Sequence, residues 1–169
     1  MIIALSMISL YMSVPLNEAQ TDAATCKILE AAYTAAIIAP SSAGIADNVY
    51  PGTVVAAEHE PSRLETWTAE YRRKVPIDED DFAEMQRLQP PPALRYKPNC
   101  VWSGAPHNYV DSGVTFKTSF SRPIIDPKRE LALVEVSFYS PGRFAFGKEC
   151  VVRKRRGSWA ATCLSSWIT

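Results

Sequence analysis

The feature that most constrains this chain of 169 residues is a pair of cysteines near its end, Cys150 and Cys163. If Arg156-Gly157 forms the two-residue turn of a β-hairpin, Arg155 pairs with Ser158. Counting outward from that pair places Cys150 directly opposite Cys163, in a non-hydrogen-bonded pair whose Cα atoms come within about 4.5 Å. That separation lies at the short end of the range compatible with a disulfide, so we expect a β-ribbon with a candidate cross-strand disulfide.

The same ribbon accounts for the basic run 153–156, RKRR, as a solvated hairpin tip. We expect Arg153 and Arg155 to point toward solvent, and the Lys154 ammonium to reach water although its stem lies on the cysteine side. A packed face is expected on that side, formed by Val152, Trp159, Ala161 and Trp167. Nucleic-acid binding would need interleaved aromatic residues or a broader basic surface, and the chain balances 18 basic against 18 acidic residues. We therefore expect no nucleic-acid partner.

Upstream of the ribbon, apolar residues alternate with polar ones from residue 114 onward, which indicates β-strands. A turn over 126–129 joins residues 124–125 to a strand over 131–139. Strands over 144–154 and 159–168 complete the set. The residues expected on one face are Val114, Phe116, Thr118 and Phe120 of the first strand and Ala132, Val134, Val136 and Phe138 of the second, with Glu135 and Ser137 opposite.

The first half of the chain has helical periodicity. Thr21 or Asp22 caps an expected helix that runs to about Ala39. Ser62 to Glu65 is a capping box that starts a second helix, and Asp78 caps a third, short one. Residues 53–57 suggest one strand, and prolines at 90–92 an extended connector. The apolar faces expected for the three helices are Ile28, Leu29, Ala32, Tyr33, Ala36 and Ile37; Leu64, Trp67, Tyr71 and Val75; and Phe82, Met85 and Leu88.

Helices followed by an antiparallel meander define the α+β class, with the N-terminal helices packed on one face of a C-terminal sheet. The alternative with the same order of elements is an NTF2-like cone, in which helices cover a curved sheet and form a pocket.

The first sixteen residues carry no charged side chain, and their apolar run is too short to span a bilayer. They match the apolar region of a secretory signal peptide, although no Lys or Arg precedes the run. Cleavage after Ala23 fits the small residues there, which divides the chain into a signal peptide, 1–23, and a single domain, 24–169. The alternatives are a buried N-terminal strand or helix, or a mis-called start codon.

Export to the periplasm or medium would make all four cysteines disulfide candidates, whereas a cytoplasmic location would leave them reduced. If Cys150 pairs with Cys163, the leftover pair is Cys26 with Cys100, whose geometry nothing in the sequence determines. The cysteines lack C-x-x-C spacing, so we expect no zinc site. No transmembrane helix is expected in the mature chain.

No motif predicts a catalytic, metal or cofactor site. Glutamates flank His59 but would share the opposite face of a strand, and the acidic run 78–81 lacks calcium-loop spacing. Cys100, His107 and Asp111 have no recognisable nucleophile spacing. Aromatic residues around the sheet leave room for a pocket, although ordinary core packing is the simpler interpretation. The residues named for that pocket are His107, Asp111, Trp102 and Tyr139. The other aromatic residues around the sheet are Phe138, Phe144, Phe146, Trp159 and Trp167.

The C-terminal third resembles a group of uncharacterised exported bacterial proteins. The shared elements are a serine-arginine step, an ALV-x-VS strand, a glycine-containing turn, G-x-W and a terminal W-[IV]-[ST]. They correspond to Ser121-Arg122, residues 131–137, Gly142 and Gly147, residues 157–159, and residues 167–169. Members often carry cysteines after the VS strand, where this chain has Ser140-Pro141-Gly142. The resemblance implies a fold and an exported location, and no activity.

The sequence thus favours a non-enzymatic exported domain that binds a protein or a small ligand. A pocket protein of the NTF2-like type with a ligand-binding or weak enzymatic role is the first alternative. An inhibitor or immunity-type protein, presenting a rigid β-surface to its partner, is the second.

Overall fold

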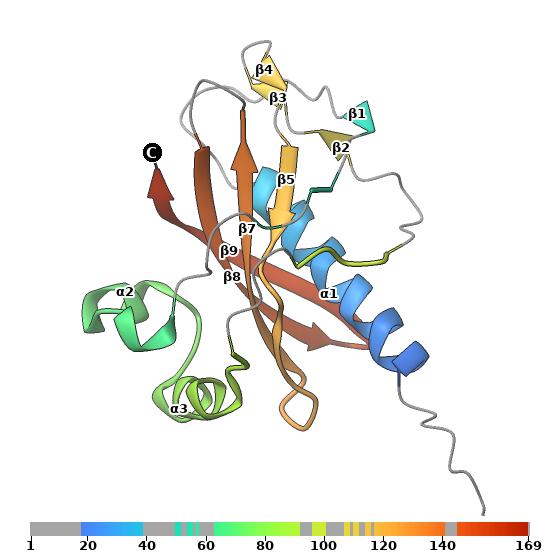
Figure 1. Ribbon diagram of the computed structural model, residues 1–169. Helices are drawn as coiled ribbons and strands as arrows, with labels where there is room; N and C mark the ends of the chain where they lie inside the picture. The colour runs from blue at the N-terminus through green and yellow to red at the C-terminus, as the bar shows by residue number, and fades with distance from the viewer. Residues whose placement is uncertain are drawn as a thin grey trace, which may run out of the picture.

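The computed structural model describes residues 18–38, 50–51, 54–55, 57, 63–91, 96–100, 107–108, 110–111, 114–115, 117–140 and 145–168 (Figure 1). Only the backbone is described at 18–22, 38, 50–51, 107–108, 110–111 and 114–115. Most of the expected signal peptide lies outside the described residues, as do Ser62, Phe116 and Phe144. The division at Ala23 stays a prediction.

Five strands form one antiparallel sheet in the order β5-β7-β8-β9, and β6 pairs with β7 beside β5. Their bounds are β5 Lys117–Phe120, β6 Ile124–Asp126, β7 Leu131–Tyr139, β8 Ala145–Arg155 and β9 Ser158–Ile168. The predicted α+β class with a C-terminal meander is confirmed. The turn between β6 and β7 forms because the Asp126 carboxylate accepts the backbone N–H groups of Lys128 and Arg129.

The β8–β9 hairpin has the predicted register. Arg156 and Gly157 both have positive φ, 51° and 83°, as a two-residue primed turn requires. Arg155 pairs with Ser158, and Cys150 pairs with Cys163. The two cysteines form a disulfide with a Cα–Cα distance of 4.1 Å. The leftover pair, Cys26 and Cys100, forms the second disulfide.

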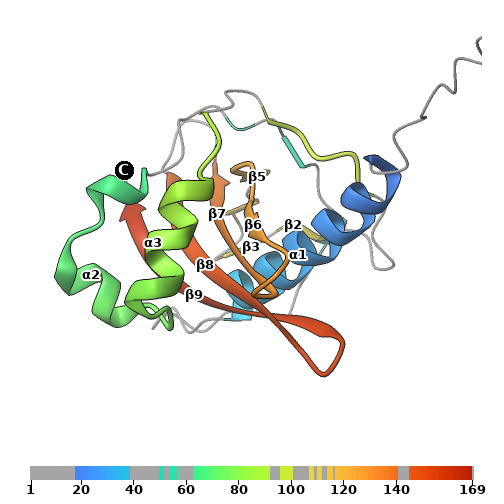
Figure 2. The same ribbon diagram turned by 90° about the horizontal axis from the view of Figure 1, so that it is seen from below.

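Helix α1, Glu18–Ile38, packs diagonally across one face of the sheet (Figure 2). It starts earlier than predicted, but its predicted buried stripe is confirmed except at Ile37, which is partly buried. The core under α1 consists of Ile28, Leu29, Ala32, Tyr33, Ala36, Phe120, Ala132, Val134, Val136, Phe138, Cys150, Val152 and Cys163. These side chains pack between α1 and the sheet.

The other helices lie on the opposite face of the sheet (Figure 2). They are the 3₁₀ helix η1, Leu64–Thr66, and helices α2, Ala69–Lys74, and α3, Glu79–Leu88. The sequence placed all helices on one face, but Leu131 and Leu133 alternate with the residues that contact α1 and therefore point the other way. The second core cluster comprises Leu64, Trp67, Val75, Phe82, Met85, Ile124, Leu131, Leu133 and Val151.

The predicted helix over 62–75 is two shorter elements. Trp67 is extended at ψ 118°, and the Thr68 side chain accepts the Tyr71 backbone N–H, so that α2 begins after Thr68. Arg63, which precedes η1, makes no side-chain cap. Asp78 caps α3 as predicted, because its carboxylate accepts the Asp81 N–H at 2.7 Å.

A β-bulge near the end of β9 changes the direction of one tryptophan. Lys148 pairs with Ser165 but Gly147 pairs with Trp167, so Ser166 is an extra residue. Trp167 was predicted on the cysteine side, and that prediction is wrong: beyond the bulge it points to the opposite face. Its ring lies over Gly147, where any Cβ would overlap it.

Two short antiparallel pairs flank the sheet: β1, Tyr50–Pro51, with β2, His107–Asn108, and β3, Val110–Asp111, with β4, Val114–Thr115. The predicted strand at 53–57 is represented, among the described residues, by one parallel bridge from Val54 to Thr118.

Candidate functional site

The candidate site is a pocket of about 250 Å³ between the 66–71 segment and strands β8 and β9. We call it the Tyr71 pocket; its lining is Thr66, Trp67, Thr68, Tyr71, Glu149 and Ser166. The Trp67 and Tyr71 rings meet edge to face, with centroids 4.9 Å apart. The bulge in β9 supplies Ser166. The pocket therefore combines an aromatic wall with polar groups from the sheet.

Two buried carboxylates lie side by side on this face of the sheet. Glu135 of β7 pairs directly with Glu149 of β8, and the two are 6% and 5% exposed. Glu135 is held in place because its Oε1 accepts the Trp167 indole N–H at 2.8 Å and the Ser137 hydroxyl at 2.9 Å. Directly opposite positions have neighbouring Cβ atoms, so the two acidic side chains adjoin each other beside the pocket.

Two hydroxyl groups complete the pocket. The Tyr71 and Ser166 hydroxyl oxygens are buried and have no hydrogen-bond partner within the part of the chain that the structure describes. Burial raises the pKa of Tyr71, and the charges of Glu149 and Glu135 raise it further. The phenol therefore stays protonated at ordinary pH and is available as a donor and an acceptor.

The pocket predicted from the sequence stays a prediction, because Tyr139 is the one member whose side chain is described. Tyr139 ends β7, is half-buried, and pairs with Lys117 and Ala145. His107 and Asp111 lie on β2 and β3, where only the backbone is described. Trp102 is outside the described residues.

Three of the other aromatic residues named from the sequence lie on the α1 side of the sheet: Phe138 is buried, and Phe146 and Trp159 are partly buried. Phe138 stacks on Phe146 with centroids 4.9 Å apart, and Trp159 packs against the cluster under α1. They belong to the α1 side of the sheet, away from the Tyr71 pocket.

The acidic run at the start of α3 has a structural role. Asp81 is buried and accepts from Arg129 and Arg153, each at 2.7 Å. Burial alone would raise the pKa of Asp81, but the two guanidinium groups outweigh it and hold the pKa below its ordinary value. Arg153 therefore binds α3 to the sheet instead of pointing to solvent, which corrects the prediction. Lys154 pairs with Glu130 at 3.0 Å and remains partly exposed.

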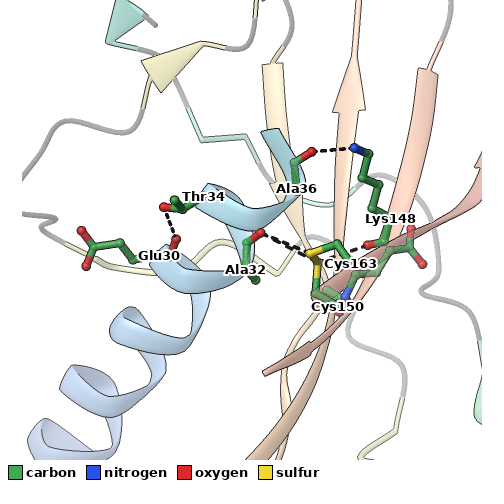
Figure 3. Close-up of a disulfide and its surroundings, with 9 residues drawn as sticks. Glu30, Ala32, Thr34, Ala36, Lys148, Cys150 and Cys163 are labelled. Carbon is green, nitrogen blue, oxygen red and sulfur yellow. Dashed lines mark hydrogen bonds between the residues drawn. A yellow bond between two sulfur atoms is a disulfide. The ribbon is translucent and has the colours of Figure 1, made fainter. Parts of the chain in front are cut away.

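A buried lysine lies beside the hairpin disulfide (Figure 3). The Lys148 ammonium donates to the Ala36 carbonyl at 2.6 Å, in the last turn of α1. Burial lowers the pKa of Lys148. The Cys150 and Cys163 sulfurs lie 3.8 and 3.5 Å from the Ala32 carbonyl oxygen, and these are contacts only, because a disulfide sulfur carries no proton. Lys148 satisfies a carbonyl that the helix end leaves open.

A second, wider groove of about 660 Å³ runs between α1 and the start of β9. Its lining includes Lys27, Glu30, Thr34, Gly157 and Trp159. None of the buried carboxylates or buried hydroxyls described above lines it, so it is the weaker candidate for a small ligand.

Among the described residues, no group of three His, Cys, Asp or Glu side chains is placed to hold a metal ion. No helix in the described part of the chain is long and apolar enough to cross a membrane. No family model, curated protein or solved structure matches the chain.

Sequence reasoning missed the Tyr71 pocket. Tyr71 fell on a predicted apolar stripe, and Glu135 was assigned only to the face away from the core residues. The one available signal was that two expected strands each carry a glutamate, Glu135 between two valines and Glu149 between Lys148 and Cys150. Their pairing depends on the β7–β8 register, which the expected turn at Gly142 does not by itself specify.

Proposed function

We propose that this protein is an exported binding domain whose Tyr71 pocket holds a small organic cation, a protonated primary amine. The observation that carries the proposal is the meeting, in one pocket, of the Glu149 carboxylate with the buried hydroxyls of Tyr71 and Ser166. A primary ammonium has three N–H donors and no acceptor. Carboxylate and hydroxyl oxygens are the acceptors that such a group requires.

The aromatic wall supports the same ligand class. Trp67 and Tyr71 line the pocket, and a cation that contacts the face of such a ring is attracted by its quadrupole. Small-ligand pockets commonly have volumes of about 300–1,000 Å³, so a pocket of this size suits a compact ligand. The charges of Glu149 and Glu135 act on Tyr71 with the sign that favours a cation.

Export is part of the proposal, and two observations support it. Both disulfides join cysteines whose thiols a reducing cytoplasm would keep reduced. The first sixteen residues have the composition of a signal peptide. Intact-mass analysis of the protein from its native host, with and without reductant, tests this part. We expect a shortened chain with two disulfides. The full-length chain in the cytoplasm with four free thiols would refute export.

Binding is tested by NMR titration of the oxidised protein with n-butylammonium chloride, and with n-butanol as the uncharged analogue. We expect the ammonium to shift the resonances of Trp67 and Tyr71 in a saturable manner, and butanol to leave them unchanged. Glu149→Gln removes the charge without changing the shape, and we expect it to weaken binding at least tenfold, as for a hydrogen bond to a charged group.

The matched control is Glu70→Gln, on helix α2, which also carries Tyr71. Glu70 pairs with Lys74 at the surface and does not line the pocket. It should bind the amine as the wild type does. Equal shifts from butanol and butylammonium, or equal losses in the two variants, would show that the pocket does not select a cation.

A further inference from the structure

A separate feature, the free edge of β9, is the basis of a second proposal. The strand is the last in the order β5-β7-β8-β9, and no described strand pairs with its outer side. It is eleven residues long and contains no charged residue and no proline. Such an edge presents unpaired N–H and C=O groups, which another extended strand satisfies.

The opposite edge of the sheet shows how this fold protects an edge. There β5 and β6 are short and separated by a break that contains Arg122 and Pro123. Lys117 is exposed, and Val55 donates its backbone N–H to the Thr118 carbonyl at 2.8 Å, so that a passing segment covers part of the edge. A charged residue, a proline, an interruption of the strand and a covering segment each discourage pairing with a further strand. Among the described residues, the outer side of β9 has none of these over residues 158–165.

The hairpin register identifies the backbone groups that face outward. Residues of β9 in non-hydrogen-bonded pairs with β8 direct their N–H and C=O groups away from it. Cys163 is in such a pair, as its short Cα–Cα distance to Cys150 indicates, and alternate residues share this property. The outward-facing set is Trp159, Ala161, Cys163 and Ser165.

This set is symmetric about Thr162, and we propose that β9 pairs antiparallel with β9 of a second copy of the chain around a two-fold axis at Thr162. Trp159 of each copy then lies opposite Ser165 of the other, and Ala161 opposite Cys163. No like charges meet along the strand, and two exposed threonines face each other at the axis, a favourable cross-strand pair. A closed two-fold interface uses the same patch on both copies.

The groove beside this edge leaves room for the second copy. Its walls are the flank of α1 and residues 157–161 at the start of β9. The flank of α1 carries two small side chains, Ala31 and Ala35, and one cation and one anion, Lys27 and Glu30. Small residues let two α1 helices approach, and the mixed charges allow complementary pairs between copies.

The experiment measures the mass of the oxidised full chain by sedimentation velocity from 5 to 200 µM. We expect a dimer that dissociates on dilution. Thr162→Lys and Thr162→Glu each place two like charges at the axis, and we expect each to weaken the dimer at least tenfold. Mixing the two variants should restore a dimer of one copy each, because opposite charges then meet. Thr162→Gln, uncharged and of similar length, should dimerise like the wild type.

Thr162 is exposed, so these variants should fold, which far-UV circular dichroism and thermal melting check. A wild-type monomer at 200 µM would overturn the proposal and leave the edge to a strand of another protein. A dimer that Thr162→Lys and Thr162→Glu leave intact, or a mixture that stays monomeric, would also overturn it. None of these measurements depends on ligand binding in the Tyr71 pocket.

Discussion

The two faces of the sheet are held by different forces. On the α1 face, fully buried apolar side chains pack under one long helix, and both disulfides adjoin that cluster. On the other face, short helices cover a smaller apolar cluster, Asp81 joins them to the sheet through two arginines, and the Tyr71 pocket opens beside buried glutamates. The α1 face therefore supplies most of the stability.

The difference between the two faces bears on how the domain tolerates a polar pocket. A pocket with buried carboxylates and hydroxyls costs stability, because each polar group removed from water needs a partner. The covalent bonds and apolar packing of the α1 face offset that cost. The helical elements that line the pocket, η1 and α2, are short, and their stability depends on packing against the sheet. We expect perturbations on the α1 face to unfold the domain and perturbations on the other face mainly to loosen the pocket.

The largest effect should come from reduction of both disulfides. Loop-closure entropy assigns about 4 kcal/mol to the 74-residue loop of Cys26–Cys100 and about 3 kcal/mol to the 13-residue loop of Cys150–Cys163. Their sum, about 7 kcal/mol, is comparable with the whole stability of a typical domain. Urea unfolding followed by circular dichroism, with and without reductant, measures it. An unchanged urea midpoint would show that the disulfides do not contribute to the greater stability of the α1 face.

A core truncation compares the two apolar clusters directly. Phe138→Ala on the α1 face removes a ring that packs against Phe146, and we expect a loss of about 4 kcal/mol. Leu133→Ala on the other face should cost about 3 kcal/mol, since fewer buried carbons are lost. Urea midpoints of the two variants give the difference. A greater loss for Leu133→Ala would reverse our ranking of the two faces.

The ion pairs of Asp81 give a smaller effect that depends on pH. Asp81→Asn should cost about 2 kcal/mol at pH 7, since hydrogen bonds to a charged group are lost. The folded-state pKa lies below the ordinary value of 3.8, so the contribution is present above that value and disappears as pH falls through the lowered pKa. Unfolding free energies of wild type and variant should therefore converge in acid. Asp80→Asn, at an exposed neighbouring residue, is the control.

The smallest predicted effect is at the start of α2. Thr68→Ala removes the acceptor for the Tyr71 N–H and should cost about 1 kcal/mol, whereas Thr68→Ser keeps the cap. Hydrogen exchange of the 69–74 amides should accelerate in the alanine variant while the β8 amides stay protected. Equal acceleration on β8 would mean that the two faces open as one unit.

Several elements were predictable because they depend on neighbours in sequence. The Arg156-Gly157 turn determined the β8–β9 register and with it the Cys150–Cys163 pair, and the Asp78 cap located α3. The capping box before η1 predicted one continuous helix, which is wrong. Trp67 is extended and Thr68 caps a separate helix, α2. The Tyr71 pocket was not predictable, since its walls come from residues 66–71, 149 and 166, whose contact no local pattern encodes.

By itself, then, the sequence determined the class of fold, the strands of the meander and the hairpin disulfide. The spacing of apolar residues, the turn residues and the number of residues between each cysteine and the turn are all local properties. Only the tertiary structure decided which face each helix covers, where Trp167 points and which acids meet. The physical reason is that packing chose among arrangements of similar local energy: a single bulge at Ser166 turned Trp167 onto Glu135. Residues distant in sequence thereby became the walls of one pocket.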